Sequence, residues 1–333
     1  MKKFDVAVVG ATGVVGEKML EVLDQRDFPV GDVYVLASHR SAGKEISFKG
    51  KTLVVEELTD KSFEGRGIDF ALFSAGSSVS LEFAPIAAAN GVIVIDNSSA
   101  WRMDEGVPLV VPEVNPEAAF THKNLIANPN CSTIQAVVAL KPIYDTFGIE
   151  RIIFSTYQSV SGSGIAGIRD LEAGIQGKEN TFYPKQIAYN VLPHIDTFQE
   201  NGYTKEEMKM VNETRKILGD QALRITSTTV RVPVMFAHSE AVNVETKKPF
   251  ELEEVFACLG QGESIVVMDD VDNGVYPTAH EAAGTDLVYV GRIRRDFSTE
   301  NALNMWVVAD NLRKGAATNA VQIAELLASR MQD

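Results

Sequence analysis

The opening of the chain constrains its fold more strongly than any other segment. Residues 4–9 form an apolar run typical of a buried strand, and an apolar helical pattern follows through Met19, Leu20 and Leu23. Between them stand three glycines in the spacing G-x-x-G-x-x-G, at Gly10, Gly13 and Gly16. A strand, a glycine turn and a helix in this order present a helix N-terminus to a pyrophosphate. The segment therefore predicts a dinucleotide-binding unit.

The alternation of strands and helices continues over the first third of the chain. Further strand-like runs lie at residues 33–37, 68–73 and 92–95, and residues 84–89 have a helical pattern. Strands that alternate with helices are typical of a parallel, doubly wound sheet. We predict an α/β domain over residues 1–130.

The texture of the sequence changes after residue 149. Long strand-like segments lie at residues 152–159, 225–234, 240–246, 287–294 and 305–309, with helical stretches at 204–218 and 251–259. This pattern predicts a second, α+β domain over residues 131–311, built on a mostly antiparallel sheet. The chain ends in an amphipathic helical pattern over residues 313–331.

Composition excludes several classes of protein. A net charge of −14 argues against a general nucleic-acid binder, because there is no basic excess to neutralise phosphates. The chain has only two cysteines, no run as long as a membrane-spanning helix, and no secretory signal pattern at its start. We therefore expect a cytoplasmic protein that binds neither nucleic acid nor membranes.

The end of the second predicted strand indicates which dinucleotide is bound. Sites that prefer NAD usually place an acidic residue there for the ribose 2′-hydroxyl. Here the strand ends in Ser38, His39, Arg40 and Ser41, without a carboxylate. Hydroxyls and a guanidinium suit a 2′-phosphate, so the loop predicts NADP. The alternative interpretation is an ordinary polar loop in solvent.

A cysteine stands where an Asn-Pro turn gives way to a helical pattern, in the stretch 128–133. Asn130 is a suitable N-cap, which places Cys131 in the first helical turn. The unpaired N–H groups and the helix dipole at this position favour a thiolate and can stabilise an oxyanion on a carbonyl bonded to the sulfur. The alternative is a small, buried, inert cysteine.

A nucleotide domain combined with such a cysteine suggests hydride transfer to or from a covalent thioester, which requires an acid or base. Of the five histidines, His238 is the best placed, because it follows the strand-like residues 228–234. Spacing alone does not select it. The Gly/Ser-rich residues 159–164 predict a loop whose backbone comes close to a ligand.

Taken together, these segments resemble the aspartate-semialdehyde dehydrogenase family, and the resemblance covers essentially the whole chain. The motifs that carry it stand in the family's order, at residues 8–16, 97–102, 126–133, 156–164, 231–240 and 310–317.

The resemblance implies roles for individual residues. Cys131 matches the nucleophile that carries the acyl group, Gln158 the residue that orients the acyl intermediate, and His238 the general acid/base. Arg231 matches the residue that binds the substrate α-carboxylate, and Glu206 the residue that meets its α-ammonium.

Further matches concern phosphate and cofactor. Arg102, Lys209 and Asn130 match phosphate-binding positions, and Glu207 remains an alternative to Glu206. An ordinary surface ion pair is the alternative for Glu206 and Lys209, which stand three residues apart. The implied cofactor-binding residues are Gly10, Thr12, Gly13, Val14, Val15, Gly16, Ser38, Arg40, Ser41, Ser161, Gly162 and Asn311.

The implied fold is a Rossmann-like NADP-binding domain, residues 1–130, and a catalytic and dimerisation domain, residues 131–311. The final helix, residues 312–333, is expected to pack back on the first domain. The protein is expected to form a homodimer. The implied reaction converts L-aspartyl-4-phosphate and NADPH into L-aspartate 4-semialdehyde, phosphate and NADP⁺, on the route to lysine, threonine, methionine and diaminopimelate. No metal is expected.

Two other functions remain open from the sequence. N-acetyl-glutamyl-phosphate reductase shares the glycine turn, cysteine and histidine, but its substrate has no free ammonium for Glu206 to meet. A non-catalytic NADP-binding sensor on the same fold would not need Cys131. Cys258 has no assigned role, and its apolar neighbours indicate packing.

Overall fold

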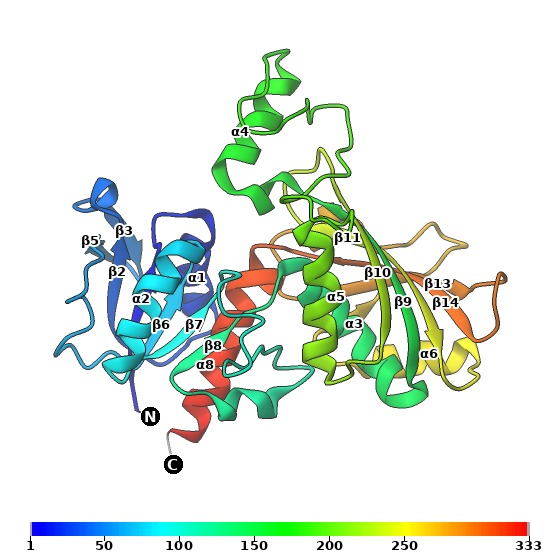
Figure 1. Cartoon of the computed structure of the whole chain (residues 1–333), viewed down its shortest axis with the longest axis horizontal. Coiled ribbons are helices and arrows are strands. Elements are labelled where there is room, and N and C mark those ends of the chain that lie inside the picture. Colours follow the sequence, from blue (N-terminus) through cyan, green and yellow to red (C-terminus); the bar gives the residue numbers. More distant parts are fainter. Residues whose placement is uncertain (1, 332–333) are drawn as a thin grey trace. The chain divides into compact units, whose positions relative to one another are not determined.

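The computed structural model describes residues 2–331, which form two compact units (Figure 1). The first unit contains the described residues up to Pro129 and those from Ala316 onward, and the second contains Asn130–Gly315. The sequence suggested divisions after residues 130 and 311. The last two residues of the expected terminal segment 312–333 lie outside the described residues.

The first unit is built on a six-stranded sheet in the order β5-β2-β1-β6-β7-β8, and every neighbouring pair is parallel. Its strands are β1 Phe4–Val9, β2 Val30–Ala37, β5 Glu56–Glu57, β6 Phe70–Phe73, β7 Ile93–Asp96 and β8 Leu125–Ala127. The helices α1 (Val14–Gln25) and α2 (Ser77–Ala89) connect β1 to β2 and β6 to β7. This arrangement confirms the predicted parallel, doubly wound sheet.

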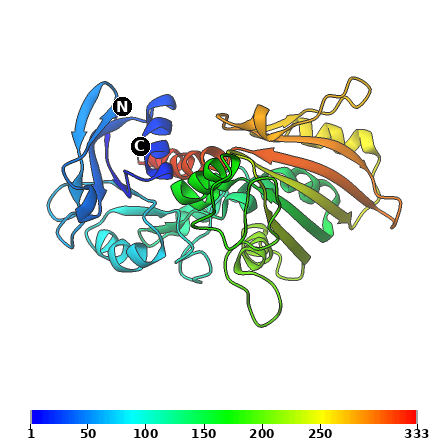
Figure 2. The same cartoon turned by 90° about the horizontal axis from the view of Figure 1, so that it is seen from above.

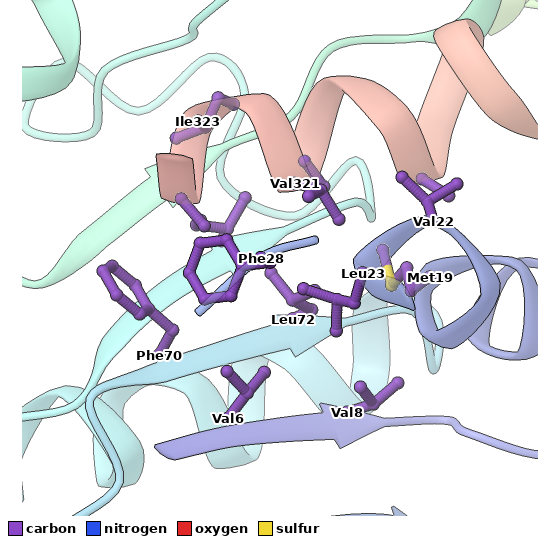
Figure 3. Packing of buried hydrophobic residues seen from close by; sticks show 14 of the residues in the cluster. Val6, Val8, Met19, Val22, Leu23, Phe28, Phe70, Leu72, Val321 and Ile323 are labelled. Carbon is purple, nitrogen blue, oxygen red and sulfur yellow. The ribbon is translucent and has the colours of Figure 1, made fainter. Parts of the chain in front are cut away.

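The core of the first unit joins both ends of the chain. Apolar residues of α8 (Thr318–Arg330) pack with those of α1 and the sheet in one buried cluster, as Figure 3 shows for Val321, Ile323 and Leu23. Figure 2 shows the terminal helix in red beside α1 in blue. Burial of one such apolar side chain contributes about 1.5–3 kcal/mol to the stability of the fold. The terminal helix therefore helps to stabilise the first unit.

A small hairpin in the first unit was not expected from the sequence. It consists of β3 (Glu45–Phe48) and β4 (Lys51–Val54), joined by Lys49 and Gly50 with φ of 47° and 75°. Two positive φ values in a two-residue loop match the twist of a hairpin. Lysine in the first position does not carry the Asn-Gly or Asp-Gly signal by which such turns are recognised.

The second unit is built on a mixed six-stranded sheet in the order β10-β9-β11-β14-β13-β12. Its strands are β9 Ile149–Gln158, β10 Arg224–Arg231, β11 His238–Thr246, β12 Ile265–Val267, β13 Val288–Arg295 and β14 Ala302–Ala309. The three inner pairings are antiparallel, as expected, whereas the outer pairs β9–β10 and β12–β13 are parallel. The long segment between β9 and β10 supplies the crossover that parallel neighbours require.

Two long helices lie against this second sheet (Figure 1). They are α3 (Cys131–Phe147), which runs through Pro142, and α5 (Lys205–Leu218). Two further helices, α4 (Gly164–Ile175) and α6 (Leu252–Gly260), extend the unit, together with the short α7 (Ala279–Ala282). Packing of α3 on β9 and β11 brings the N-terminus of α3 to one edge of the sheet.

The end of the chain differs in detail from the expected single helix. Residues Arg313–Ala317 form a π-helical turn, and α8 begins at Thr318. Turns of this kind are frequent at functional sites. Within residues 2–331, no helix combines the length and apolar character needed to cross a membrane.

Candidate active site

The ends of three strands lie together at one end of the second sheet, which we call the catalytic edge. Because β9 and β10 run parallel, their last residues, Gln158 and Arg231, are paired neighbours. Strand β11 runs the opposite way, so its first residue, His238, lies at the same edge. The topology thus gathers an amide, a guanidinium and an imidazole that are far apart in the sequence.

Helix α3 presents Cys131 as its first residue. The side-chain oxygen of Asn130 accepts hydrogen bonds from the backbone N–H groups of Ser132 and Thr133, at 3.0 and 3.3 Å. Asn130 is therefore the N-cap, which confirms the prediction. Gly315 is close on the other side, since a Cβ atom there would lie 3.0 Å from the Cβ of Cys131. A larger residue at 315 would push against the cysteine.

The sulfur of Cys131 lies 3.2 Å from Nε2 of His238. The other ring nitrogen, Nδ1, accepts a hydrogen bond of 3.0 Å from the backbone N–H of Ser159. A neutral ring that accepts at Nδ1 carries its hydrogen on Nε2, which therefore points at the sulfur. Burial, assisted by the charge of Arg231, lowers the pKa of His238 to about 3, so the ring is neutral at pH 7.

Glu206 lies at the centre of a buried polar cluster beside these groups. Its Oε1 accepts hydrogen bonds from Nδ2 of Asn130 at 2.9 Å and from Nε2 of Gln158 at 3.0 Å. Its Oε2 lies 2.9 Å from Nζ of Lys209, which also reaches Asp196 at 2.9 Å. Although burial acts to raise it, the charge of Lys209 and these hydrogen bonds hold the pKa of Glu206 at about 2. Glu206 is thus a carboxylate at all physiological pH values.

The structure separates Glu206 from its neighbour Glu207. Oε2 of Glu207 accepts from the backbone N–H of Thr204 at 2.7 Å and closes the capping box of α5, while Oε1 accepts from the N–H of Thr229 at 3.2 Å. Both oxygens of Glu207 are therefore used by backbone groups. Glu206 is the carboxylate that joins the Cys131 cluster.

Arg231 is buried at the same edge with part of its guanidinium unused. Its Nη1 donates to the carbonyl oxygen of Ser159 at 2.8 Å, and its buried Nε has no hydrogen-bond partner in the structure. Gly162 lies against it, since a Cβ atom there would be 3.0 Å from Nη1 and 3.3 Å from the His238 ring. An unpaired guanidinium N–H next to a glycine is suited to a ligand carboxylate.

Two residues predicted to contact cofactor lie behind His238. Ser161 and Asn311 are buried and bonded to each other, with Ser161 Oγ 3.1 Å from Asn311 Oδ1 and 3.0 Å from Asn311 Nδ2. Asn311 Oδ1 also accepts from the backbone N–H of Ala237 at 3.0 Å. Together with Gly162, these residues belong to the second unit and lie next to His238 or to the residues that contact it.

The glycine turn of the first unit has the shape that the sequence predicted. Gly10 has φ of 85°, and a Cβ atom on it would lie 2.6 Å from the carbonyl oxygen of Ser74. A Cβ atom on Gly16 would lie 2.2 Å from the carbonyl oxygen of Gly10, so α1 approaches the turn closely. Gly13 is the N-cap of α1 and provides no side-chain cap. The helix N-terminus, with Thr12, Val14 and Val15 around it, therefore fits a pyrophosphate.

The loop after β2 carries Ser38, Arg40 and Ser41, of which the first two are exposed. The Thr12 hydroxyl donates to Ser41 Oγ at 3.2 Å, so this loop meets the glycine turn. The structure also corrects one expectation. Glu57 on β5 pairs with Ala37 at the end of β2, and its Oε2 lies 3.0 Å from Nδ1 of His39. A carboxylate is therefore present near the loop, contributed by a neighbouring strand that follows later in the chain.

Arg102 lies in the first unit and is buried. Its Nε donates to the carbonyl oxygen of Asn128 and its Nη2 to that of Asn97, both at 2.9 Å. These carbonyls follow the ends of β8 and β7, so the carboxyl edge of the parallel sheet holds the guanidinium.

Sequence reasoning missed two residues that contact the catalytic cluster, and a third that lies close to it on β11. Ser159 contacts His238, Glu213 Oε2 accepts from the backbone N–H of Asn130 at 2.7 Å, and Glu240 lies on β11 two residues after His238. Glu213 could have been found by its place two turns after Glu206 on the same face of α5. The positions of Ser159 and Glu240 depend on strand and loop geometry, which no local sequence pattern predicts.

Glu240 is fully buried, and neither of its carboxyl oxygens has a hydrogen-bond partner in the structure. Burial raises the pKa of Glu240 well above its usual value, and the nearby amide of Gln135 offsets only part of this effect. The raised pKa favours the neutral, protonated form of Glu240 in the folded chain.

Glu240→Gln should stabilise the fold increasingly as the pH rises. Above pH 4.5 the unfolded wild type loses the Glu240 proton while the folded chain keeps it, so wild-type stability falls with pH. The variant lacks this penalty, and its advantage in free energy of unfolding should grow by about 1.4 kcal/mol per pH unit until the folded pKa is reached. Urea unfolding at several pH values measures it, with the exposed Glu253→Gln as control. A pH-independent difference would contradict the assignment.

Comparison with known proteins agrees with this geometry. Residues 5–122 match the family described as semialdehyde dehydrogenase, NAD binding domain, and residues 140–314 match semialdehyde dehydrogenase, dimerisation domain. Aspartate-semialdehyde dehydrogenase of Aquifex aeolicus is 56% identical over 333 residues, which cover 97% of this chain and 98% of the relative.

Solved structures agree as well. Aspartate semialdehyde dehydrogenase II of Vibrio cholerae, complexed with ASA, has a TM-score of 0.95 and 53% identity, covering 99% of both chains. Aspartate semialdehyde dehydrogenase of Candida albicans with NADP has a TM-score of 0.78 and 26% identity, covering 98% of this chain and 99% of the other. The chain belongs to the aspartate-semialdehyde dehydrogenase family of oxidoreductases.

Proposed function

We propose that this chain catalyses the NADP-dependent reductive dephosphorylation of L-aspartyl-4-phosphate to L-aspartate 4-semialdehyde. The observation that carries the proposal is Cys131 at the N-terminus of α3 with its sulfur 3.2 Å from Nε2 of His238. The names of the relatives, and the ASA in the Vibrio cholerae structure, support the substrate. The product would serve cytoplasmic synthesis of lysine, threonine, methionine and diaminopimelate.

The first chemical step is acyl transfer to the cysteine. The Cys131 thiolate attacks the carbonyl carbon of the acyl phosphate, a carbon–sulfur bond forms, and phosphate leaves with the electron pair of the carbon–oxygen bond. The first-turn N–H groups of α3 and the Nε2–H of His238 are placed to favour negative charge on the sulfur and on the carbonyl oxygen. The product of this step is a thioester on Cys131.

The second step reduces the thioester and releases the aldehyde. NADPH, when bound, would supply the hydride. After taking up a proton from water, His238 would give the Nε2 proton of the protonated ring to the oxygen of the thiohemiacetal and take it back as the carbon–sulfur bond breaks. Gln158, held by Glu206 at 3.0 Å, lies at the same strand edge and orients the acyl group. The aldehyde leaves, and Cys131 is again a thiolate.

Each charge of the substrate has an opposite charge among these residues. We assign the α-carboxylate to the unused guanidinium edge of Arg231 and the α-ammonium to Glu206. The departing phosphate is assigned to Arg102 and Lys209, and Asn130 is assigned the same role. Lys209 is paired with Glu206 in the structure, so phosphate would compete with that carboxylate for its ammonium.

The cofactor is assigned to two groups of residues that fit its parts. The pyrophosphate suits the cradle of Gly10 and Gly16 at the start of α1, and the 2′-phosphate suits the loop with Ser38, Arg40 and Ser41. Ser161, Gly162 and Asn311 would contact the nicotinamide end beside His238. The NADP in the Candida albicans structure supports this choice of cofactor.

Arg40→Ala should weaken NADP far more than NAD. Arg40 is exposed, and in this assignment it faces the 2′-phosphate that only NADP carries. Losing a hydrogen bond to a charged group costs about 1.5–3 kcal/mol, which corresponds to a roughly 10- to 150-fold rise in the Kd for NADP. Fluorescence titration with each dinucleotide measures the effect, and the exposed Lys44→Ala controls for the loss of one positive charge. Equal losses for NADP and NAD would remove the basis of the assignment.

We also propose a homodimer, formed through the second unit. The family description of residues 140–314 as a dimerisation domain supports it. An open groove of about 720 Å³ in the second unit is lined by side chains such as Tyr157 of β9, Ala241 of β11 and Trp306 of β14. Tyr157 is 39% exposed, and its ring centroid lies 5.3 Å from that of Trp306. An open apolar sheet face of this kind is typical of a subunit interface.

The reaction is tested in the reverse, oxidative direction. Purified chain with aspartate semialdehyde, phosphate and NADP⁺ should produce NADPH at a rate that depends on phosphate. N-acetyl-glutamate semialdehyde is the matched comparison, because its blocked amine offers no charge to Glu206. A preference for the acetylated substrate would assign the chain to the rival reaction, and no phosphate-dependent reduction with either would refute acyl-phosphate chemistry.

A further inference from the structure

Ser159 places both a hydrogen-bond donor and an oxygen that can accept next to Nδ1 of His238. The backbone N–H of Ser159 donates to Nδ1 at 3.0 Å, and the Ser159 hydroxyl oxygen lies 3.1 Å from the same nitrogen. Ser159 and His238 are both fully buried. The protonation state of Nδ1 therefore depends on what Ser159 offers it.

The two groups of Ser159 suit different states of the ring. The backbone N–H requires a lone pair on Nδ1, so it favours the neutral ring with hydrogen on Nε2, toward Cys131. A protonated ring has a hydrogen on Nδ1 that must find an acceptor. The Ser159 hydroxyl can accept it, because its own hydrogen can go to Oδ1 of Asn311 at 3.1 Å.

Asn311 holds this arrangement from the other side. Its Oδ1 also accepts from the backbone N–H of Ala237 at 3.0 Å. Ala237 directly precedes His238 and has φ of 67°, a left-handed conformation that non-glycine residues rarely adopt. Such a conformation persists only where the surrounding structure holds it in place. Residues with conformations of this kind cluster at functional sites. The Asn311 carboxamide thus connects the backbone before His238 with the hydroxyl behind its ring.

We propose that Ser159 is a positioning residue that serves both protonation states of His238. Its backbone N–H fixes the Nε2–H tautomer of the neutral ring, and its hydroxyl accepts the Nδ1 hydrogen of the protonated ring. This inference rests on the proposed function, in which the protonated ring gives its Nε2 hydrogen to the thiohemiacetal oxygen. The ring that results has its one hydrogen on Nδ1 only while the thiohemiacetal lasts. It regains the Nε2 hydrogen when the carbon–sulfur bond breaks, and returns to the resting Nε2–H tautomer when the Nδ1 hydrogen is lost to water.

Other charged groups also face His238, and the test must hold them constant. Arg231 on β10 lowers the pKa of His238 and Glu206 on α5 raises it. The carboxylate of Asp310, just after β14, is engaged by the backbone N–H groups of Gly284 and Leu312. Cys131 on α3 lies 3.2 Å from Nε2, and Glu240 stands two residues after His238 on β11. Substitution of Ser159 changes none of these groups.

The test compares Ser159→Ala with Ser159→Thr in the full-length chain. The alanine variant keeps the backbone N–H but loses the acceptor, so kcat should fall roughly 10- to 100-fold while KM for aspartate semialdehyde and NADP⁺ changes by less than about threefold. The threonine variant keeps the hydroxyl and should restore kcat. Ser227→Ala is the control, because Ser227 is also buried and its hydroxyl has no partner in the structure. If the alanine variant does not fold, Ser159→Cys replaces it.

A second measurement does not depend on activity. Nitrogen-15 NMR of histidine-labelled chain, with His238 assigned from its absence in His238→Asn, reports which ring nitrogen carries hydrogen. At neutral pH, wild type and Ser159→Ala should both carry it on Nε2. Hydrogen on Nδ1 in the neutral wild type, unchanged kcat in Ser159→Ala, or a change confined to KM would each overturn the proposal. Absence of semialdehyde activity in the wild type would refute the proposed function, and the NMR result would still decide the tautomer.

Discussion

Cys131→Ala should reduce turnover of aspartate semialdehyde by at least roughly 10⁴-fold, because removal of a covalent nucleophile eliminates the thioester route altogether. NADP binding should stay largely intact, since the glycine turn and the Arg40 loop, to which the two phosphate groups of the cofactor are assigned, belong to the other unit of the chain. Steady-state kinetics and a dinucleotide titration measure the two effects separately. Substantial remaining turnover would refute covalent catalysis.

Cys258→Ala is the matched control for this experiment. Cys258 lies on α6, donates to the carbonyl oxygen of Val255 at 3.3 Å, and has a pKa raised by burial. It should therefore be unreactive, and its alanine variant should have wild-type activity. An alkylating aldehyde analogue should label Cys131 and leave Cys258 unmodified, which mass spectrometry of peptides can establish. Labelling of Cys258 without labelling of Cys131 would show that Cys131 is not the nucleophile.

His238→Asn should lower kcat by roughly 10²- to 10⁴-fold, the contribution typical of general acid–base catalysis. Asparagine can still donate a hydrogen bond toward the sulfur, but it cannot give and regain a proton. KM for the aldehyde should change little, because Arg231 and Glu206 hold the charged groups of the substrate in our assignment. Steady-state kinetics with each ligand varied in turn measures the separation.

His194→Asn provides the comparison for His238. His194 is exposed and stacked on Phe198, with ring centroids 4.3 Å apart, so its replacement should leave kcat unchanged. Iodoacetamide alkylation of Cys131 offers a further readout, since loss of the Nε2–H group should slow it at neutral pH. A His238→Asn enzyme with wild-type kcat would exclude the imidazole from proton transfer.

Much of the site's local structure followed from the sequence alone. The βα unit with Gly10 and Gly16 and the cap of Asn130 over Cys131 depend on residues within one or two turns of each other. Hydrogen bonds from a cap reach only the second and third residues of its helix, and apolar periodicity reports the face that a helix or strand buries. Such short-range features can be read from the order of residues.

Tertiary structure decided which distant groups meet. Cys131 and His238 are 107 residues apart in the chain, and only the antiparallel pairing of β11 with β9 brings His238 to the edge where α3 begins. The capping box that occupies Glu207 selects Glu206 for the cluster, and parallel pairing of β5 with β2 brings Glu57 to a loop that looked free of carboxylates. Strand register and sheet order are set by packing over the whole unit, so no local pattern predicts them.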